Sequence, residues 1–374
     1  MRDPSASVII TNFNYADFLP AAIDSALNQG YGSLEVIVVD DGSTDDSQRV
    51  LATYKGRVKT VLKENGGQAS AFNAGFAVSS GDIICFLDAD DILLPHAIEN
   101  AAGLMRDSTV VRVHWPLLAV DADGKSSYGD KLIPDKPLPD GDLRHELMQG
   151  GISGYITSPT SGNAWSRSYL EQIFPLNEEK YRFAADGLLS CLAPLYGMTG
   201  AITGCQSLYR IHGHNNSAKV PFKRRFDQYV FRMNLLCEQL NEFGVPTEGT
   251  LETWKNDGYR RLEHMTELGA ELGPYIPPGH SYILLEMNEW AFGTLLEGRK
   301  SIPFLEKDGM YWGAPSDDDI AIQEFDRLRG KGASYIVFGY PAFWYLDHYV
   351  KFNRYLRTNF ECVLGNEHFI IYKI

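Results

Sequence analysis

The chain has 374 residues, of which 44% are hydrophobic and 22% are charged, a composition typical of globular proteins that bury a large core. This length leaves room for about two or three domains. The formal net charge of −14 at pH 7 argues against a protein that coats nucleic acid, because binding to phosphates needs a surplus of Lys and Arg. We therefore expect no nucleic acid among its partners.

The cysteines point to a reducing compartment. Their number is odd, none forms a paired short spacing, and three of them lie within apolar runs, as reduced core cysteines do. The first residues show no positive region followed by an apolar stretch, and no run approaches the roughly eighteen apolar residues of a membrane span. We expect a cytoplasmic protein without disulfide bonds. The cysteines are Cys85, Cys191, Cys205, Cys237 and Cys362.

The first hundred residues alternate short strands with helices. Continuous apolar runs predict strands at residues 7–12, 34–39, 58–62 and 83–87. Apolar residues at helical spacing predict helices at residues 18–27 and 72–78, and a third capped by Ser43 or Thr44. Such alternation predicts a doubly wound α/β sheet, in which ligands bind beyond the carboxyl ends of the strands.

Polar residues follow three of these strands at the point where each ends, in segments 11–13, 40–41 and 88–91. Three carboxylates lie within the last segment, where a buried strand emerges and like charges repel and lose hydration. A divalent cation removes that problem, since Mg²⁺ or Mn²⁺ is held by one or two carboxylates plus substrate phosphates. The alternative is a solvated acidic turn that caps the next helix.

Four segments in this order resemble the successive signatures of family-2 glycosyltransferases. They are SVIITNFN (7–14), VVDDGSTD (38–45), NGG (65–67) with NAG (73–75), and FLDADD (86–91). The resemblance extends over about residues 5–217. It implies a GT-A fold, that is, a Rossmann-like α/β domain, and an inverting, hexosyltransferase-type enzyme. Such an enzyme uses a nucleotide-sugar donor and a carbohydrate or glycolipid acceptor in cell-surface polysaccharide or glycoconjugate synthesis.

The resemblance also implies which residues bind the donor. Thr11 and Phe13 would contact the nucleobase, and Asp41 would accept a hydrogen bond from a base imide, which favours uracil. Gly67 would let the backbone approach the nucleotide. Asp88 would lie near the ribose or the metal.

A metal site follows from the same resemblance. Asp90 would bind the Mn²⁺ or Mg²⁺ that bridges both donor phosphates, with Asp91 close by. His212 matches the histidine that closes over the metal and the diphosphate; its alternative is a core or surface histidine, and His214 would be a neighbour. Phe72 stands where the family often has a basic residue, which removes the expected cationic contact to the diphosphate from this helix.

Two later segments carry the remaining catalytic residues. Residues 159–167 resemble the segment that lines the sugar and acceptor cleft, with Ser161, Gly162 and Asn163 as its small residues; the alternative is a plain tight turn into a strand. Asp186 opens a helix amid apolar residues, and a partly desolvated carboxylate makes a usable proton acceptor. The resemblance makes Asp186 the general base. Its alternative role is to satisfy backbone donors at the helix N-terminus.

The rest of the chain carries no catalytic constellation that we identify. We expect a GT-A domain over residues 1–218, a helical extension over 219–273 and a small α/β domain of unknown role over 274–374, which ends in a hairpin. Residues 121–150 are rich in Asp, Gly, Pro and Lys and should form a loop near the acceptor entrance. The basic start of the extension fits either peripheral contact with an anionic membrane surface or a solvated helix face.

Two rival functions remain from the sequence. A nucleotidyltransferase also uses carboxylates and a metal on an α/β sheet, although residues 11–15 contain no Lys or Arg for a basic phosphate loop. A non-catalytic sugar-binding or partner-binding protein would place its function in the C-terminal domain. The sequence leaves the sugar, the nucleobase, the acceptor and the oligomeric state open.

Overall fold

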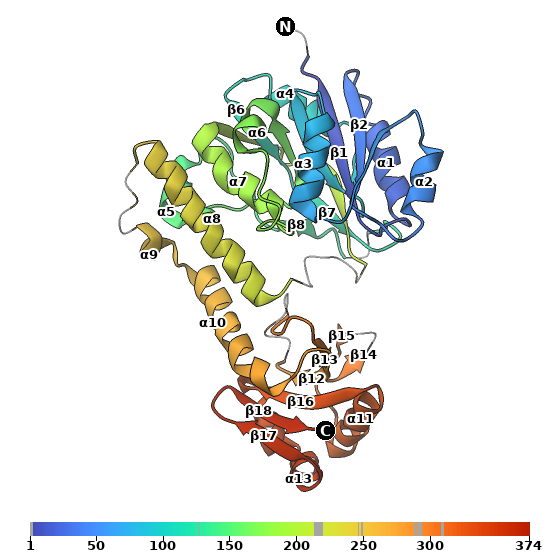
Figure 1. Ribbon diagram of the computed structural model, residues 1–374, viewed down its shortest axis with the longest axis vertical. Helices are drawn as coiled ribbons and strands as arrows, with labels where there is room; N and C mark the ends of the chain where they lie inside the picture. The colour runs from blue at the N-terminus through green and yellow to red at the C-terminus, as the bar shows by residue number, and fades with distance from the viewer. Residues whose placement is uncertain are drawn as a thin grey trace. The chain divides into compact units, whose positions relative to one another are not determined.

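The computed structural model describes residues 3–126, 128–212, 220–245, 247, 250–287, 290, 294–307 and 310–374. The chain divides into two compact units (Figure 1). The N-terminal unit comprises residues 1–214 and 228–256, and the C-terminal unit comprises residues 215–227 and 257–374. The predicted domain borders at residues 218 and 273 stay a prediction. His214 and Lys219, at the start of the basic stretch, lie outside the described residues.

The N-terminal unit contains a seven-stranded sheet in the order β10-β6-β9-β4-β1-β2-β3 and a four-stranded sheet in the order β5-β11-β7-β8. In the large sheet β1 to β4 run parallel, and β9 runs antiparallel between β4 and β6. The strands are β1 (Ala6–Asn12), β2 (Leu34–Asp40), β3 (Lys59–Leu62), β4 (Ile83–Asp88), β5 (Ile92–Leu93), β6 (Val110–His114), β7 (Leu117–Val120), β8 (Leu132–Ile133), β9 (Asn163–Ser166), β10 (Met198–Ala201) and β11 (Ser207–Arg210).

Helices cover both faces of the large sheet (Figure 1). The helices of this unit are α1 (Leu19–Leu27), α2 (Ser47–Thr53), α3 (Gln68–Val78), α4 (Ala97–Leu104), α5 (Arg144–Gly150), α6 (Arg167–Ile173) and α7 (Ala185–Tyr196), with parts of the 222–254 region. Val8 and Ile10 of β1 pack with α1 and α4, whereas Ile9 faces α3, because successive strand residues point to opposite faces. Both faces are therefore buried, which explains the continuous apolar runs in the sequence.

Close packing of α3 depends on two of its residues. A Cβ atom at Gly75 would clash with the side chain of Ile9, so the glycine lets the helix lie directly on the sheet. Phe72 is fully buried and stacks on Phe86 of β4 with ring centroids 3.9 Å apart. Residue 72, which is often basic in the family that the sequence resembles, thus lies in the core here, and this explains why it is a phenylalanine.

Two local expectations were wrong. The helix α2 begins at Ser47 instead of near residue 44, because the hydroxyl of Ser43 is engaged with Asp40 and with the backbone N–H of Asn14 at 2.9 Å. The segment 121–150 is not a loop throughout. It ends in α5, whose Leu147 is fully buried.

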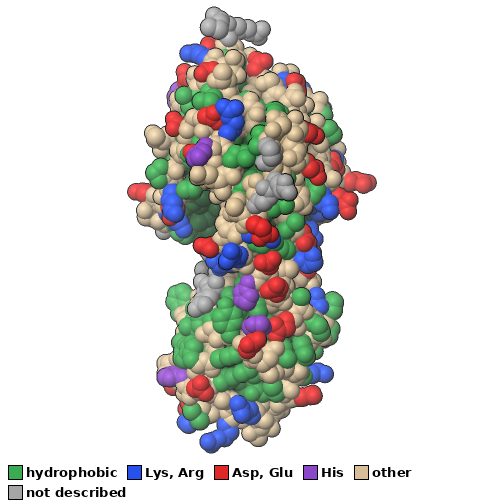
Figure 2. Space-filling view, turned by 90° about the vertical axis from the view of Figure 1, so that its left-hand side faces the viewer, with side chains coloured by type: hydrophobic (Ala, Val, Ile, Leu, Met, Phe, Trp, Pro, Cys, Tyr) green, Lys and Arg blue, Asp and Glu red, His purple; other side chains and the backbone are tan. Residues whose placement is uncertain are grey.

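The C-terminal unit is a smaller α/β structure around a five-stranded sheet in the order β13-β12-β16-β18-β17. The strands of this sheet are β12 (Ser281–Leu285), β13 (Lys300–Pro303), β16 (Ala333–Gly339), β17 (Glu361–Gly365) and β18 (Phe369–Lys373). A separate pair is formed by β14 (Glu306–Lys307) and β15 (Met310–Tyr311). Its helices include α10 (Asp257–Leu272), α11 (Asp318–Gly330), α12 (Trp344–His348) and α13 (Val350–Asn359). The antiparallel pair β17 and β18 is the predicted terminal hairpin. Figure 2 shows hydrophobic side chains gathered on one face of this unit.

Two further helices are α8 (Phe222–Glu242) and α9 (Thr250–Trp254). Residues 228–242 of α8 and all of α9 belong to the N-terminal unit. Among the helices that the structure describes, none combines the length and apolarity needed to cross a lipid bilayer. All five cysteines are free, as the sequence indicates.

Candidate active site

The polar residues at the carboxyl ends of β1, β2 and β4 lie together, as the parallel topology requires. In the strand register Thr11 pairs with Asp88, and Asn12 pairs with Asp40. The hydroxyl of Thr11 donates to Oδ1 of Asp88 at 3.4 Å, and the buried Asn12 amide donates to Oδ1 of Asp40 at 3.1 Å. Phe13, the next residue, is 39% exposed. One edge of the sheet thus combines carboxylates with an accessible aromatic ring.

Asp41 is held by the loop that leads into α3. Its carboxylate accepts hydrogen bonds from the backbone N–H groups of Gly66 at 2.9 Å and Gly67 at 2.7 Å, and from Nζ of Lys63 at 2.7 Å. Gly67 has a φ of +85°, and a Cβ atom there would clash with Arg182. The glycine is therefore required by the fold itself. Whether the backbone also approaches a nucleotide here stays a prediction.

The structure brings Asp90 and His212 together although 122 residues separate them. Nε2 of His212 lies 3.0 Å from Oδ2 of Asp90, and both side chains are largely buried, with 2% and 11% of their surface exposed. The imidazole packs against the rings of Tyr15 and Phe18, with centroids 5.4 Å and 4.6 Å away. Aromatic packing therefore fixes the histidine ring beside the carboxylate. The role of His212 at a metal site stays a prediction.

Asp91 has a structural role that the sequence did not indicate. Its Oδ1 accepts a hydrogen bond of 3.1 Å from the backbone N–H of Arg210, two residues before His212. The Arg210 side chain donates from Nε to the backbone carbonyl of Asp90 at 2.8 Å and lies over the ring of Phe18. Asp91 and Arg210 therefore fasten the end of β11 to the acidic turn and so place His212.

The carboxylates at this edge favour protonation more than ordinary aspartates do. Burial raises the pKa of Asp88, and the negative charges of Asp90 and Asp186 raise it further. Burial, followed by the charges of Asp90 and Asp88, raises the pKa of Asp91 well above its usual value. The raised pKa values mean that the fold supplies too little positive charge to stabilise all of these carboxylates in the ionised state.

The donor atoms fit a hard divalent cation. Asp90 offers a carboxylate oxygen, which suits both Mn²⁺ and Mg²⁺, and His212 offers an imidazole nitrogen, which Mn²⁺ accepts more readily than Mg²⁺ does. Within the described residues no group of three or more His, Cys, Asp or Glu is arranged to hold a metal ion. A cation held here would therefore need oxygen ligands from a bound molecule, and phosphates are suitable ones.

Asp186 lies in the first turn of α7. Burial raises the pKa of its carboxyl group, whereas the backbone N–H of Gly187, the charge of Arg232 and the hydroxyl of Thr160 act to lower it. The same Thr160 hydroxyl lowers the pKa of Asp88 and accepts a hydrogen bond of 3.1 Å from Nε2 of Gln68. Thr160 therefore links the two carboxylates, and the sequence did not single it out.

The three residues after Thr160 are buried. The hydroxyl of Ser161 accepts from the backbone N–H of Asp88 at 3.1 Å, and Oδ1 of Asn163 accepts from Nε and Nη2 of the buried Arg112 at 3.0 and 2.7 Å. A Cβ atom at Gly162 would clash with its surroundings. Both hydroxyls thus reach carboxylates of the site: Ser161 interacts with Asp91, and Thr160 interacts with Asp88 and Asp186. That Ser161, Gly162 and Asn163 line an acceptor cleft stays a prediction.

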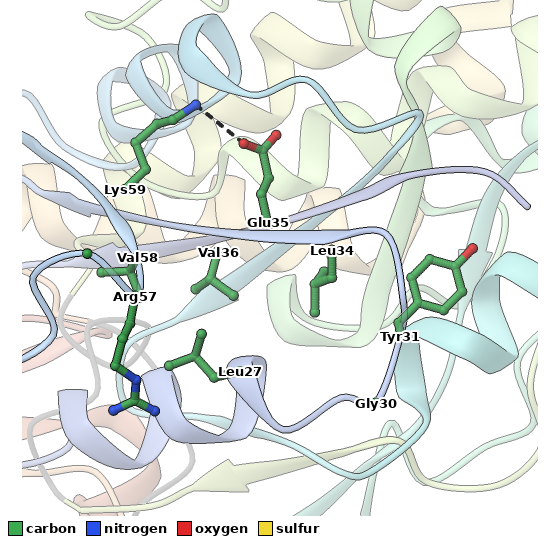
Figure 3. A pocket seen from close by; sticks show the side chains of 10 residues that line it. Leu27, Gly30, Tyr31, Leu34, Glu35, Val36, Arg57, Val58 and Lys59 are labelled. Carbon is green, nitrogen blue, oxygen red and sulfur yellow. Dashed lines mark hydrogen bonds and ion pairs between the residues drawn. The ribbon is translucent and has the colours of Figure 1, made fainter.

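An open pocket of about 510 Å³ lies at the opposite edge of the sheet, around the amino end of β2 (Figure 3). Its floor is apolar, with Leu27, Leu34 and Val58 among the lining side chains. Figure 3 shows Lys59 directed toward Glu35 across the rim, at 3.3 Å. Lys59 and Glu35 neutralise each other as an ion pair, and none of the predicted site residues lines the pocket.

The sequence matches known families over its first part. Residues 7–144 match the family model described as "Glycosyl transferase family 2". An uncharacterised glycosyltransferase of Nostoc sp. is 37% identical over 214 residues, which make up 56% of this chain and 66% of that protein. Chondroitin synthase of Pasteurella multocida is 39% identical over 127 residues, 33% of this chain and 13% of that protein. The chain thus spans less than two thirds of the length of these relatives.

Solved structures include similar chains. TarS of S. aureus in complex with UDP-GlcNAc is 18% identical, with a TM-score of 0.47 over 71% of this chain and 80% of that chain. Together with the observed sheet, the family match confirms the Rossmann-like α/β fold of the GT-A type expected from the sequence.

Proposed function

Through residues 7–144 the chain belongs to glycosyl transferase family 2, and on that premise we propose that it is a metal-dependent, inverting glycosyltransferase. It would move a sugar from a nucleoside-diphosphate donor to an acceptor hydroxyl. The observation that carries the proposal is the convergence of Asp88, Asp90 and Asp186 on one edge of the sheet, where burial raises the pKa of the carboxyl groups of Asp88 and Asp186, and the charges of Asp90 and Asp186 raise that of Asp88 further.

The donor would bind along the ends of β1 and β2. Phe13 offers an exposed ring face to a nucleobase, and Thr11 lies beside Asp88, which would face the ribose. Asp41 is fixed by Gly66, Gly67 and Lys63, so its carboxylate is oriented before a ligand arrives. A carboxylate accepts up to about four hydrogen bonds, which leaves room for a base imide N–H and supports a UDP-sugar as donor.

Asp90 and His212 would hold Mn²⁺ or Mg²⁺ together with the donor phosphates. When bound, this ion supplies positive charge for the departing diphosphate. The residues around it keep the two ligands in place: Tyr15 packs against the imidazole, and Arg210 fixes the backbone of Asp90. This arrangement is electrostatic preorganisation, in which the protein prepares the charges and dipoles before the reaction.

Asp186 would remove the proton from the acceptor hydroxyl while that oxygen attacks the anomeric carbon from the side opposite the leaving group. The bond to the diphosphate breaks, the sugar acquires oxocarbenium character, and the new bond forms with inversion. A carboxyl group with a raised pKa is a stronger base than an ordinary aspartate. Carbohydrate and glycolipid hydroxyls are the acceptors we propose.

A panel of UDP-, GDP- and dTDP-sugars tests the proposal. Each donor is incubated with Mn²⁺ or with EDTA, and the released nucleoside diphosphate is measured. We expect Mn²⁺-dependent release from a UDP-sugar and none with EDTA. Turnover of nucleoside triphosphates in preference to every diphospho-sugar would instead identify a nucleotidyltransferase, and the absence of any turnover or nucleotide binding would favour a binding protein.

A further inference from the structure

Helix α8 lies beyond the family match, yet it brings two polar side chains to the start of α7 in the same compact unit. Gln228 and Arg232 are four residues apart on α8 and so lie on one face of it. Both interact with the segment that carries Asp186, as the next contacts show. This raises the question of what α8 does for the carboxylate.

Gln228 fixes the backbone that enters α7. Its side-chain amide donates to the carbonyl oxygens of Phe183 at 2.7 Å and Lys180 at 3.3 Å, and the residue is 7% exposed. Between these carbonyls and the helix, Ala184 has a φ of +57°, a left-handed conformation that a non-glycine residue seldom adopts. The hydrogen bonds of Gln228 therefore act on a strained turn two residues before Asp186.

Arg232 brings a positive charge to the same helix end. Its guanidinium lies so close to Gly187 that a Cβ atom on that residue would clash with Nη1. Nε of Arg232 is buried and has no hydrogen-bond partner within the described structure. Arg232 is partly buried, and a cation in such surroundings is stabilised by a nearby carboxylate; Asp186, the neighbour of Gly187, is attracted to it electrostatically.

Other charged groups also act on Asp186. Asp88 at the end of β4 repels it, and Arg112 of β6 attracts it. The guanidinium of Arg112 is already engaged twice by the side chain of Asn163, which holds it in the core. Arg232, in contrast, reaches the site from an outer helix, and the absence of a side chain at Gly187 makes room for it.

We propose that α8 positions the general base: Arg232 keeps the Asp186 carboxylate ionised, and Gln228 holds the turn that aims it into the site. This inference rests on the proposed function, because it takes Asp186 as the proton acceptor. Arg232 and Gln228 act through Asp186 and need not contact the substrate. Helix α8, which lies beyond the family-matched segment, is then part of the catalytic unit.

The pH dependence of turnover tests the role of Arg232. The best UDP-sugar of the donor panel serves as substrate, and the acid limb of the kcat profile reports ionisation of the base. In Arg232→Gln the limb should move to higher pH by about one unit, since an attractive charge is lost, and kcat at pH values on the acid limb should fall about tenfold with the donor KM unchanged. Arg232→Lys should restore most of the activity.

Two further variants keep the test decisive if Arg232→Gln does not fold. Gly187→Ala retains the arginine but displaces its guanidinium, so it should move the acid limb in the same direction by a smaller amount. Lys223→Gln is the matched control, because it removes an exposed cation of α8 that pairs with Asp227. A limb that stays at the wild-type pH in both Arg232→Gln and Gly187→Ala overturns the inference.

Asp186→Asn separates this inference from the proposed function. If that variant retains turnover, Asp186 is not the base, and the proposed mechanism fails. If Asp186→Asn is inactive while the Arg232→Gln profile matches the wild type, only the positioning role of α8 fails. A structural role alone would lower kcat at every pH without shifting the limb.

Discussion

The two edges of the large sheet use carboxylates in opposite ways. At the amino edge, Oε1 of Glu35 accepts hydrogen bonds from the hydroxyl of Ser7 at 2.7 Å and from both the N–H and the hydroxyl of Ser80 at 2.6 and 2.8 Å. Burial acts to raise the pKa of Glu35, but these bonds and Lys59 lower it to about 2. At the carboxyl edge, burial and neighbouring charges raise the pKa of Asp88 and Asp91.

This difference separates structural from functional charge. Glu35 is satisfied by groups of its own fold, so it stabilises the folded state and has little to offer a ligand. The hydrogen bonds to Asp88 and Asp91 do not offset burial and repulsion, so the pKa of each stays raised and their ionised forms destabilise the folded state. Carboxylates that destabilise the folded protein at the carboxyl edge are typical of a binding site, where a cation and a charged ligand from outside complete the set of interactions. Variants at the two edges should therefore respond in opposite ways.

The largest effect should come from Asp186→Asn. The amide is nearly the same size as the carboxylate but cannot accept the acceptor's proton, so kcat should fall by about 10²–10⁴-fold. Binding of UDP, measured by calorimetry, should stay within about twofold of the wild type, because the change spares the donor contacts. Wild-type turnover in this variant would mean that another group is the base.

Asp90→Asn should weaken the metal-dependent step next. We expect the affinity for UDP in the presence of Mn²⁺ to fall by at least about tenfold, since one of two proposed protein ligands loses its charge. Glu35→Gln removes the same charge from the other edge and serves as the control, with no expected change in UDP affinity. Equal losses in both variants would show that the net charge, and not the site, decides binding.

Glu35→Gln should instead reduce stability. The variant loses charge-assisted hydrogen bonds, so its free energy of unfolding at pH 7 should fall by about 2 kcal/mol. The folded pKa of Glu35 is lowered from 4.5 to about 2, so this stabilisation is present above pH 4.5 and disappears as the pH falls toward 2. Urea denaturation at pH 7 and pH 3 measures the difference, which should shrink at the lower pH.

Asp186→Asn should show the opposite sign in the same assay. Because burial raises the folded pKa of Asp186 above its unfolded value, the wild type loses stability as the pH rises from about 4 through that folded pKa. The amide does not titrate, so the stability of the variant relative to the wild type should rise between pH 4 and pH 8, on top of the pH-independent cost of losing the partner of Arg232. A relative stability that stays constant or falls between pH 4 and pH 8 would contradict the contrast between the edges.

The smallest effect should follow from Phe13→Ala. The ring is exposed at the carboxyl edge, and its loss removes a stacking surface for the base that is worth about 1 kcal/mol. UDP affinity should fall about fivefold without a change in thermal stability. Leu62→Ala, at an exposed apolar residue at the end of β3, is the control and should leave UDP affinity unchanged.

The sequence predicted the sheet because each strand is a local pattern. The apolar runs of β1, β2 and β4 are read directly, and their parallel order follows from the alternation with helices. The acidic turn was read from the sequence itself, and the metal roles of Asp90 and His212 came from the family resemblance. The structure brings the two side chains to 3.0 Å, and their roles stay predictions. Phe72 shows how a core requirement, stacking on Phe86, replaces a family preference.

The residues that organise the site were not predictable, because their partners are far away in the chain. The backbone N–H of Arg210 donates a hydrogen bond to Asp91, 119 residues away in the sequence, and the amide of Gln68 donates to Thr160, 92 residues away. Arg232 is one of several basic residues on α8, and only the fold shows that it meets Gly187. A sequence pattern reports local structure and known motifs, whereas such contacts arise only when the chain folds.

The central claim is that the carboxyl edge of the sheet binds a nucleoside diphosphate through a divalent cation. Calorimetry of UDP binding with and without Mn²⁺, on the wild type and on Asp90→Asn, tests it most directly. We predict binding to the wild type that requires Mn²⁺ and is lost in Asp90→Asn. Binding of equal strength in the absence of Mn²⁺, or in Asp90→Asn, would contradict the claim.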